Sequence, residues 1–244
     1  MRFVVFAIAR VPDTATARRL FDLDGLDDTD VAKVLAHQRK QQTGDSETLR
    51  WDQAAIAGIT LVQHSVDKVQ VETLSGPGRG EPEMLEAFYR AALREGRTVS
   101  WDGERDALPL IHFRSLCHSV SFPAYWQTRR ERSDFHLDLG HSLAVSADDA
   151  PGLDETARRL GFPGLTGLDP EQVAEAWLAG DVEPVRAWTE LCALNVYLMA
   201  LRLFGVTGQV SRHDGARAEN TLRDFLGRRR EPAIERFLAA WDGR

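Results

Sequence analysis

Cysteine is scarce in this chain of 244 residues, which contains only Cys117 and Cys192. The two are far apart and form no C-x-x-C motif, so neither a disulfide framework nor a structural zinc site is indicated, and a reducing, cytoplasmic setting fits best. Positive charge is also in deficit, because the formal net charge is −7. This balance argues against a surface coated with positive charge for binding nucleic acid.

Long apolar runs are missing as well. No run approaches the roughly 20 residues of a membrane span, so we expect no contact with a membrane. The apolar run Phe3–Ala9 is too short, and too weakly basic in front, for a signal peptide. With 43% hydrophobic and 27% charged residues, the composition is typical of a globular protein, and a single domain over residues 1–244 is the simplest expectation.

Apolar runs and turn signals alternate along the chain in a pattern that predicts an α/β fold. Strands are expected at Phe3–Ala9, Ala55–Gln63, Lys68–Leu74 and Thr98–Trp101, the second and third as a hairpin. Helices are expected at Pro82–Arg94, Leu108–His118, Gly152–Leu160, Pro170–Leu178, Val182–Phe204 and Ala216–Trp241. A helical insertion, residues 14–52, separates the first strand from the hairpin, and its polar stretch RKQQTGDSET is predicted to be a mobile loop.

The helix predicted from Val182 has a clear apolar stripe. Asp181 precedes it as a candidate N-cap. Spacings of three and four place one set of apolar residues on a single face toward the core: Val185, Trp188, Cys192, Val196 and Met199. Trp188 and Cys192 are therefore expected to be neighbours, one turn apart.

Three separated segments carry a family resemblance: FAIARVPD at residues 6–13, SWDGERDALP at 100–109 and WTELCALNVY at 188–197. In order and spacing they are similar to the motifs F-D-I-E-T-V-P-D, S-W-N-G-x-x-F-D-L-P and Y-C-E-T-D-V-L-N-T-Y. The chain thereby resembles the predicted 3′-5′ exonucleases related to the exonuclease domain of family B DNA polymerases, in the DEDD superfamily. HLDL at His136–Leu139 is close to a further family signature.

The resemblance implies a fold: an RNase H-like mixed sheet flanked by helices, with the insertion 14–52 after the first strand and a helical C-terminal extension, residues 206–244. It also implies a 3′-5′ exonuclease that uses two magnesium or manganese ions. The family's four metal-binding acids would fall at Ala7, Ala9, Ala107 and Cys192, and its active-site tyrosine at Trp188.

These substitutions remove the chemistry that the family requires. Two-metal hydrolysis needs carboxylates that hold two divalent cations about 4 Å apart. Methyl groups bind no metal, and a lone thiol suits zinc better than magnesium. We therefore predict a pseudo-exonuclease with no catalytic residue, metal or cofactor, in which Trp188 and Cys192 pack with Ala7, Ala9 and Ala107 as an apolar patch.

An active enzyme with displaced ligands is the alternative, and its candidate acids are Asp13, Asp102, Asp106 and Glu190. Glu190 lies two residues from Cys192, which on a helix turns it by about 200°, away from that face. Asp102 and Asp106 are better placed, near the start of a helix. Acids are also common there as capping residues.

The identity of the partner stays open between single-stranded nucleic acid and a protein. Arg10 follows the emptied pair of positions on the first strand, and Arg129 with Arg130 follows an aromatic pair, so these three arginines are the candidate nucleic-acid contacts. The negative net charge favours a protein instead. The sequence also leaves the oligomeric state open.

Overall fold

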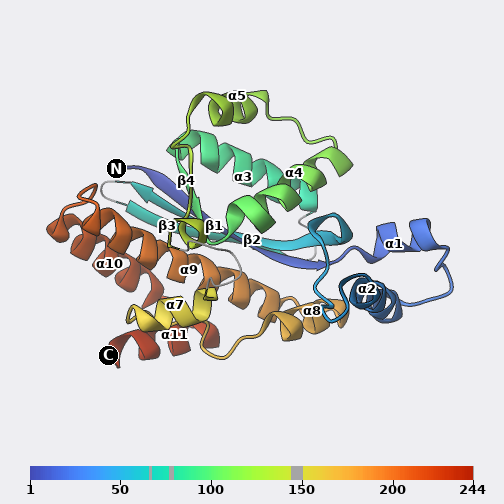
Figure 1. Cartoon of the computed structure of the whole chain (residues 1–244). Coiled ribbons are helices and arrows are strands. Elements are labelled where there is room, and N and C mark those ends of the chain that lie inside the picture. The colour runs from blue at the N-terminus through green and yellow to red at the C-terminus, as the bar shows by residue number, and fades with distance from the viewer. Residues whose placement is uncertain (66–67, 77–79, 144–150, 244) are drawn as a thin grey trace.

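A five-stranded sheet forms the centre of the computed structural model, which describes residues 1–65, 68–76, 80–143 and 151–243 (Figure 1). The strands are β1 (Phe3–Pro12), β2 (Ala54–Ser65), β3 (Lys68–Ser75), β4 (Thr98–Ser100) and β5 (His136–Asp138), in the order β3-β2-β1-β4-β5. The pairs β1–β2 and β2–β3 are antiparallel, whereas β1–β4 and β4–β5 are parallel. This mixed sheet with helices on both faces confirms the predicted RNase H-like α/β fold class.

Strand β1 is apolar almost throughout because both of its faces are covered. Phe3 and Val5 belong to the core on one face, and Val4 and Phe6 to the core on the other. Between Ala9 and its successor the register with β2 shifts by one residue. Such a bulge twists the strand locally, and bulges of this kind are common beside functional sites.

One face of the sheet carries helices α3 (Glu81–Glu95), α4 (Leu108–Cys117) and α5 (Pro123–Glu131) (Figure 1). Their core is rich in aromatic side chains. Phe6 packs edge to face on Phe88, at a ring separation of 4.9 Å, and Tyr89 packs likewise on Tyr125 at 4.7 Å. Edge-to-face pairs of this kind add about 0.5–1.5 kcal/mol to the burial of area.

The other face is covered by α9 (Glu183–Val206), which contacts β1, β2 and β3. Around it pack α7 (Leu153–Arg159), α8 (Pro170–Leu178), α10 (Arg212–Leu226) and α11 (Pro232–Asp242) (Figure 1). Among the described residues, α9 is the one helix whose length and composition would suffice to cross a membrane, contrary to the expectation that no such run exists. Its burial between the sheet and these helices accounts for its apolar character.

The insertion after β1 forms two helices, α1 (Thr14–Phe21) and α2 (Asp28–Thr43), which lie beyond the end of the sheet (Figure 1). They pack around Ala17, Val31 and Leu35. Residues 39–43 continue α2, so the prediction of a mobile loop was wrong there. The sequence offered no helix-breaking residue before Gly44, and α2 ends at that glycine with a φ of 92°.

Other boundaries also differ from the sequence prediction. The C-terminal stretch is two helices, α10 and α11, because Gly227 ends the first and Pro232 begins the second. Helix α5, the short helix α6 (Leu139–Leu143) and strand β5 were not predicted as elements. Each of these three is short, so periodicity gave little signal. Two further short turns, η1 (Trp51–Gln53) and η2 (Gly103–Ala107), precede β2 and α4.

Candidate functional site

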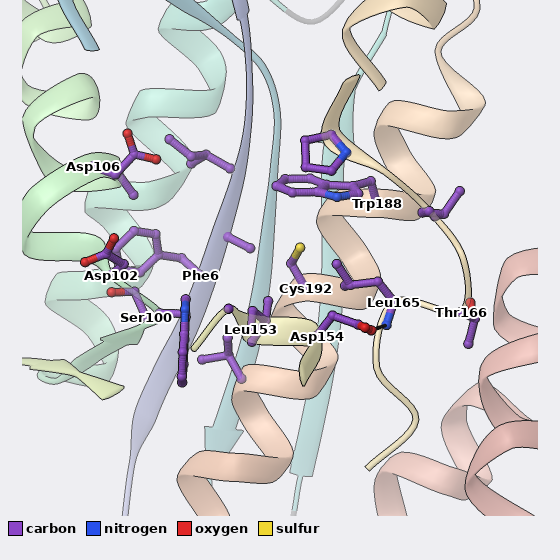
Figure 2. Close-up of a pocket in the computed structure, with 18 of the residues that line it drawn as sticks. Phe6, Ser100, Asp102, Asp106, Leu153, Asp154, Leu165, Thr166, Trp188 and Cys192 are labelled. Carbon is purple, nitrogen blue, oxygen red and sulfur yellow. Dashed lines mark hydrogen bonds between the residues drawn. The ribbon is translucent and has the colours of Figure 1, made fainter. Parts of the chain in front are cut away.

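A cavity of about 750 Å³ lies beside the middle of β1 (Figure 2). One wall comes from the end of β4 and from η2, and the other from α9 and the segment that begins with α7. Its lining includes Ala7, Ser100, Trp101, Asp102, Asp106, Ala107, Leu153, Asp154, Leu165, Thr166, Trp188, Cys192 and Val196. This volume is within the range of about 300–1,000 Å³ that is typical of pockets for small ligands.

Four of the five positions singled out by the family motifs line this cavity, namely Ala7, Ala107, Trp188 and Cys192. Ala9 is fully buried beside it, in a small cluster against Trp188. Ala7 and Trp188 pack against the core cluster that contains Cys192, as predicted, whereas Ala107 belongs to the core on the other face of the sheet, so the predicted patch is divided by the cavity. Methyl groups and a thiol are too small to fill the space between walls that other contacts hold apart.

The chemistry of these side chains does not fit a two-metal centre. The alanines offer no oxygen, and burial raises the pKa of the Cys192 thiol, which keeps it protonated. The indole nitrogen of Trp188 is buried and has no acceptor within the described part of the chain. In the same part of the chain, no group of three or more His, Cys, Asp or Glu side chains could hold a metal ion.

The wall formed by the second motif is fixed by Asp138 of the HLDL segment. Its carboxylate accepts hydrogen bonds from the backbone N–H groups of Asp102 (3.0 Å), Glu104 (2.9 Å) and His141 (3.1 Å). Asp102 has a φ of 53°, in the left-handed region. Two of these charge-assisted bonds, from Asp102 and Glu104, hold the turn after β4 in a conformation that the backbone alone disfavours, and the third, from His141, ties α6 to the same carboxylate.

Gly103 allows this turn to pack closely against β4 and β5. A Cβ atom at Gly103 would lie 1.9 Å from Ser100 Oγ and 3.1 Å from His136 Nε2. His136 in turn bridges the two strands, with Nδ1 2.8 Å from Thr98 Oγ1 and Nε2 3.1 Å from Ser100 Oγ. Burial lowers the pKa of His136 to about 4, so this ring is neutral at physiological pH and acts as a structural bridge.

Two of the displaced acids, Asp102 and Asp106, line the cavity as predicted for the alternative enzyme. Asp106 forms an ion pair with Arg10, and Asp102 lies 4.0 Å from Arg105. Desolvation and the neighbouring Asp102 raise the pKa of Asp106, although the charge of Arg10 acts in the opposite direction. Both carboxylates are therefore engaged with guanidinium groups.

The other two displaced acids lie elsewhere. Asp13 caps α1 by accepting from Thr16 N–H (3.0 Å) and pairs with Arg114 at 2.5 Å. Glu190 is buried against Arg229, with an N–O distance of 3.0 Å, and faces away from Cys192, as the helical geometry predicted. Neither residue belongs to the cavity lining.

Asp13 belongs to a buried group of charges at the end of β1. Arg114 also binds Glu81 at 2.5 Å, and Glu81 accepts from Ile56 N–H at 2.6 Å and contacts His118 at 2.6 Å. We call Asp13, Arg114, Glu81 and His118 the charge cluster. It closes the junction between β1, α3 and α4.

A third carboxylate in the cavity, Asp154 on α7, was missed by the sequence analysis. Its Oδ1 accepts from Leu165 N–H at 2.7 Å, and its Oδ2 lies 3.3 Å from Arg158. Asp154 thus ties the segment 162–168 to α7. In the sequence it is one of two acids in the first turn of a helix, a common position, and no signal distinguished it.

Two of the three candidate nucleic-acid contacts are engaged in ion pairs within the chain. Arg10 pairs with Asp106, and Arg129 lies 2.7 Å from Glu104, so both bind acids of the same turn, η2. Arg130 is exposed on α5. The structure therefore brings the first two to one region of the surface, where their charges are compensated.

The model of one protein family matches residues 46–241, and that family is described as a predicted 3′-5′ exonuclease related to the exonuclease domain of PolB. The chain belongs to this family. The matched region contains Ala107, Trp188 and Cys192 and begins after β1, so Ala7 and Ala9 are related to the family by the first motif alone. No curated protein matches the chain.

Membership of the exonuclease family explains the position of the cavity. It lies where the family motifs converge from β1, η2 and α9. The motif residues Ser100, Gly103 and Asp138 are present in or behind its walls, while the positions at which the motifs predict acids, Ala7, Ala107 and Cys192, carry methyl groups and a thiol.

Proposed function

We propose that this chain is a pseudo-exonuclease, a member of the exonuclease family that binds a partner without cleaving it. One observation carries the proposal: where the motifs place metal-binding acids, the cavity presents Ala7, Ala107 and Cys192, with Trp188 in place of the tyrosine. In this proposal the protein uses no metal or other cofactor and acts in the cytoplasm, in line with its two free cysteines.

The rival is an active exonuclease that uses displaced acids. Asp102 and Asp106 support it, because both line the cavity. Asp13 and Glu190 speak against it, because each is bound to an arginine outside the cavity. A two-metal centre needs several carboxylates around one point, and each of the three that line the cavity, Asp102, Asp106 and Asp154, already lies within 4.0 Å of an arginine.

A nuclease assay separates the two. The purified protein is incubated with single-stranded DNA or RNA labelled at the 5′ end, with magnesium or manganese, and the products are resolved by length. We expect no shortening from the 3′ end. Shortening that chelator abolishes, and that Asp102→Asn or Asp106→Asn also abolishes, would establish the active enzyme and refute the pseudo-exonuclease.

For the partner, the compensated charges of Arg10 and Arg129 support protein docking over nucleic acid. Binding through phosphates needs free cations and weakens steeply as salt rises. Binding to a protein depends on a few buried anchors and is less sensitive to salt.

Fluorescence anisotropy of labelled single-stranded DNA and RNA, at low and at physiological salt, tests this choice. We expect no saturable binding at physiological salt. Saturable binding that Arg10→Glu or Arg130→Glu weakens, and that Arg90→Glu on α3 does not, would make nucleic acid the partner. Arg90 is a matched control because it is exposed and pairs with Glu86 on its own helix.

A further inference from the structure

We propose that the cavity binds a small, neutral, largely apolar aromatic molecule, an inference that rests on the proposed loss of metal chemistry. The family site would recognise a phosphate through metal ions. This cavity instead offers ring faces, methyl groups and a thiol, and its charges cancel within the chain.

The walls supply the apolar contacts. Trp101 follows β4 and Trp188 lies on α9, so aromatic rings approach the cavity from both sides. Ala7, Cys192 and Val196 line the space with small apolar groups, and Figure 2 shows Cys192 beside Trp188 on α9. Aromatic rings favour other aromatic rings beyond the burial of area, which selects a flat apolar ligand.

The charges at the cavity select against an ion. Three carboxylates line it, Asp102, Asp106 and Asp154, and each has a guanidinium group within 4.0 Å, from Arg105, Arg10 and Arg158 respectively. An anion would face the three carboxylates, and a cation would compete with the guanidinium groups that already pair with them, of which Arg158 also lines the cavity. A neutral molecule avoids both and leaves the existing pairs intact.

Both walls are fixed before a ligand binds. Asp138 holds the turn from Asp102 to Glu104 through backbone hydrogen bonds, and Asp154 holds Leu165. Helix α9, which belongs to the same wall as Asp154, is buried in the core from Thr189 to Leu201. A preformed cavity binds with little ordering cost, which favours small ligands.

The test uses 1-aminoanthracene, a flat aromatic amine that is uncharged near neutral pH and fluoresces more strongly in apolar surroundings. The full chain is titrated with this dye in the absence of metal. We expect saturable binding at one site. Indole-3-acetamide, which is neutral, should displace the dye at least about ten times more effectively than indole-3-acetate, an anion of the same shape.

Variants locate the site. Ala7→Leu fills the cavity and should weaken dye binding at least about tenfold, whereas Ala239→Leu on the exposed face of α11 should not. Trp188→Ala removes a ring face and should also weaken binding, while Trp126→Phe, on α5, is its control. Circular dichroism and the melting temperature confirm that each variant is folded. The two cavity variants act in different ways, because Ala7→Leu reduces the volume of the cavity and Trp188→Ala removes a ring contact.

The proposal is overturned by an absence of saturable binding, by equal affinity in the wild type and in both cavity variants, or by stronger displacement with deoxyadenosine monophosphate plus magnesium than with indole-3-acetamide. The last result would mean that the site keeps the nucleotide preference of its family. The nuclease assay is independent of the dye, so failure of the ligand proposal and failure of the pseudo-exonuclease proposal give different results.

Discussion

Strand β1 borders two regions that differ in their acidic residues. Beside the cavity it carries Ala7 and Ala9, where the motif predicts acids, and directly after its end comes Asp13, which matches the motif. Asp13 is buried, yet it keeps its charge because Arg114 lies 2.5 Å away and Thr16 donates a backbone N–H.

The comparison shows what a buried carboxylate requires. In the charge cluster the counter-charge is part of the chain, so Asp13 and Glu81 are neutralised as soon as the fold forms. In a metal site the counter-charge must arrive from solution. Without such an ion, an unpaired acid in the interior would destabilise the fold.

Arg114→Met breaks the charge cluster and is expected to have the largest effect. It removes the guanidinium group that pairs with both Asp13 and Glu81, which should lower the free energy of unfolding by about 3–5 kcal/mol. Urea denaturation measures this loss. Arg90→Met removes an exposed helical ion pair and should stay within about 0.5 kcal/mol of the wild type. Equal effects of the two changes would show that the cluster has no special role.

Restoring acids beside the cavity should have the next largest effect. Ala9→Glu places a carboxylate in a fully buried position and should destabilise the fold by about 2–4 kcal/mol, through desolvation and overpacking. Ala7→Asp should cost less, because Ala7 borders the open cavity. In the double variant that combines Ala7→Asp with Ala9→Glu, added magnesium should not restore the melting temperature. A melting temperature equal to that of the control Ala239→Glu would contradict the apolar packing at Ala9.

The pH dependence of two aspartates sharpens the comparison further. Desolvation tends to raise the pKa of Asp13, but hydrogen bonds from Thr16 and the charge of Arg114 outweigh it and hold the pKa below 3.8. Its stabilising effect is therefore present above about pH 4 and is lost as the pH falls through the lowered value. Asp13→Asn should cost about 1–3 kcal/mol at neutral pH and reduce the loss of stability in acid.

For Asp106 we expect the opposite dependence of stability on pH, and the smallest effect of the variants considered. Its pKa is raised above 3.8, so stability declines as the pH rises through that raised value. Asp106→Asn should leave stability at neutral pH unchanged or higher by less than about 1 kcal/mol, because both it and Arg10 reach solvent. Thermal melts from pH 3 to 7 compare the two variants. A clear loss of stability at neutral pH would show that the pair with Arg10 outweighs desolvation.

The sequence predicted those parts of the fold whose signal is local. Apolar runs and their periodicity predicted strand β1, the hairpin of β2 and β3, and helix α9. Helical geometry alone predicted that Glu190 points away from Cys192. Elements of a few residues, such as β5, carry too little pattern for detection.

The candidate site was only partly predictable for a related reason. Motif spacing indicated Ala7, Ala107, Trp188 and Cys192, and these four line one cavity. Asp154 comes from a helix between the motifs, and only tertiary packing brings it to the cavity. The size of the cavity also depends on how far apart Asp138 and α9 hold its walls, which no single segment specifies.

The position of α9 in the chain affects how the protein is made. Three of the strands that it contacts, β1, β2 and β3, are complete at Ser75, whereas α9 ends at Val206. At about 5–20 residues per second, a ribosome needs on the order of ten seconds to synthesise the intervening segment. During that time the nascent sheet exposes Val5 and Val62 on the face that α9 will bury. Productive folding therefore depends on keeping this apolar face from aggregating until the helix emerges.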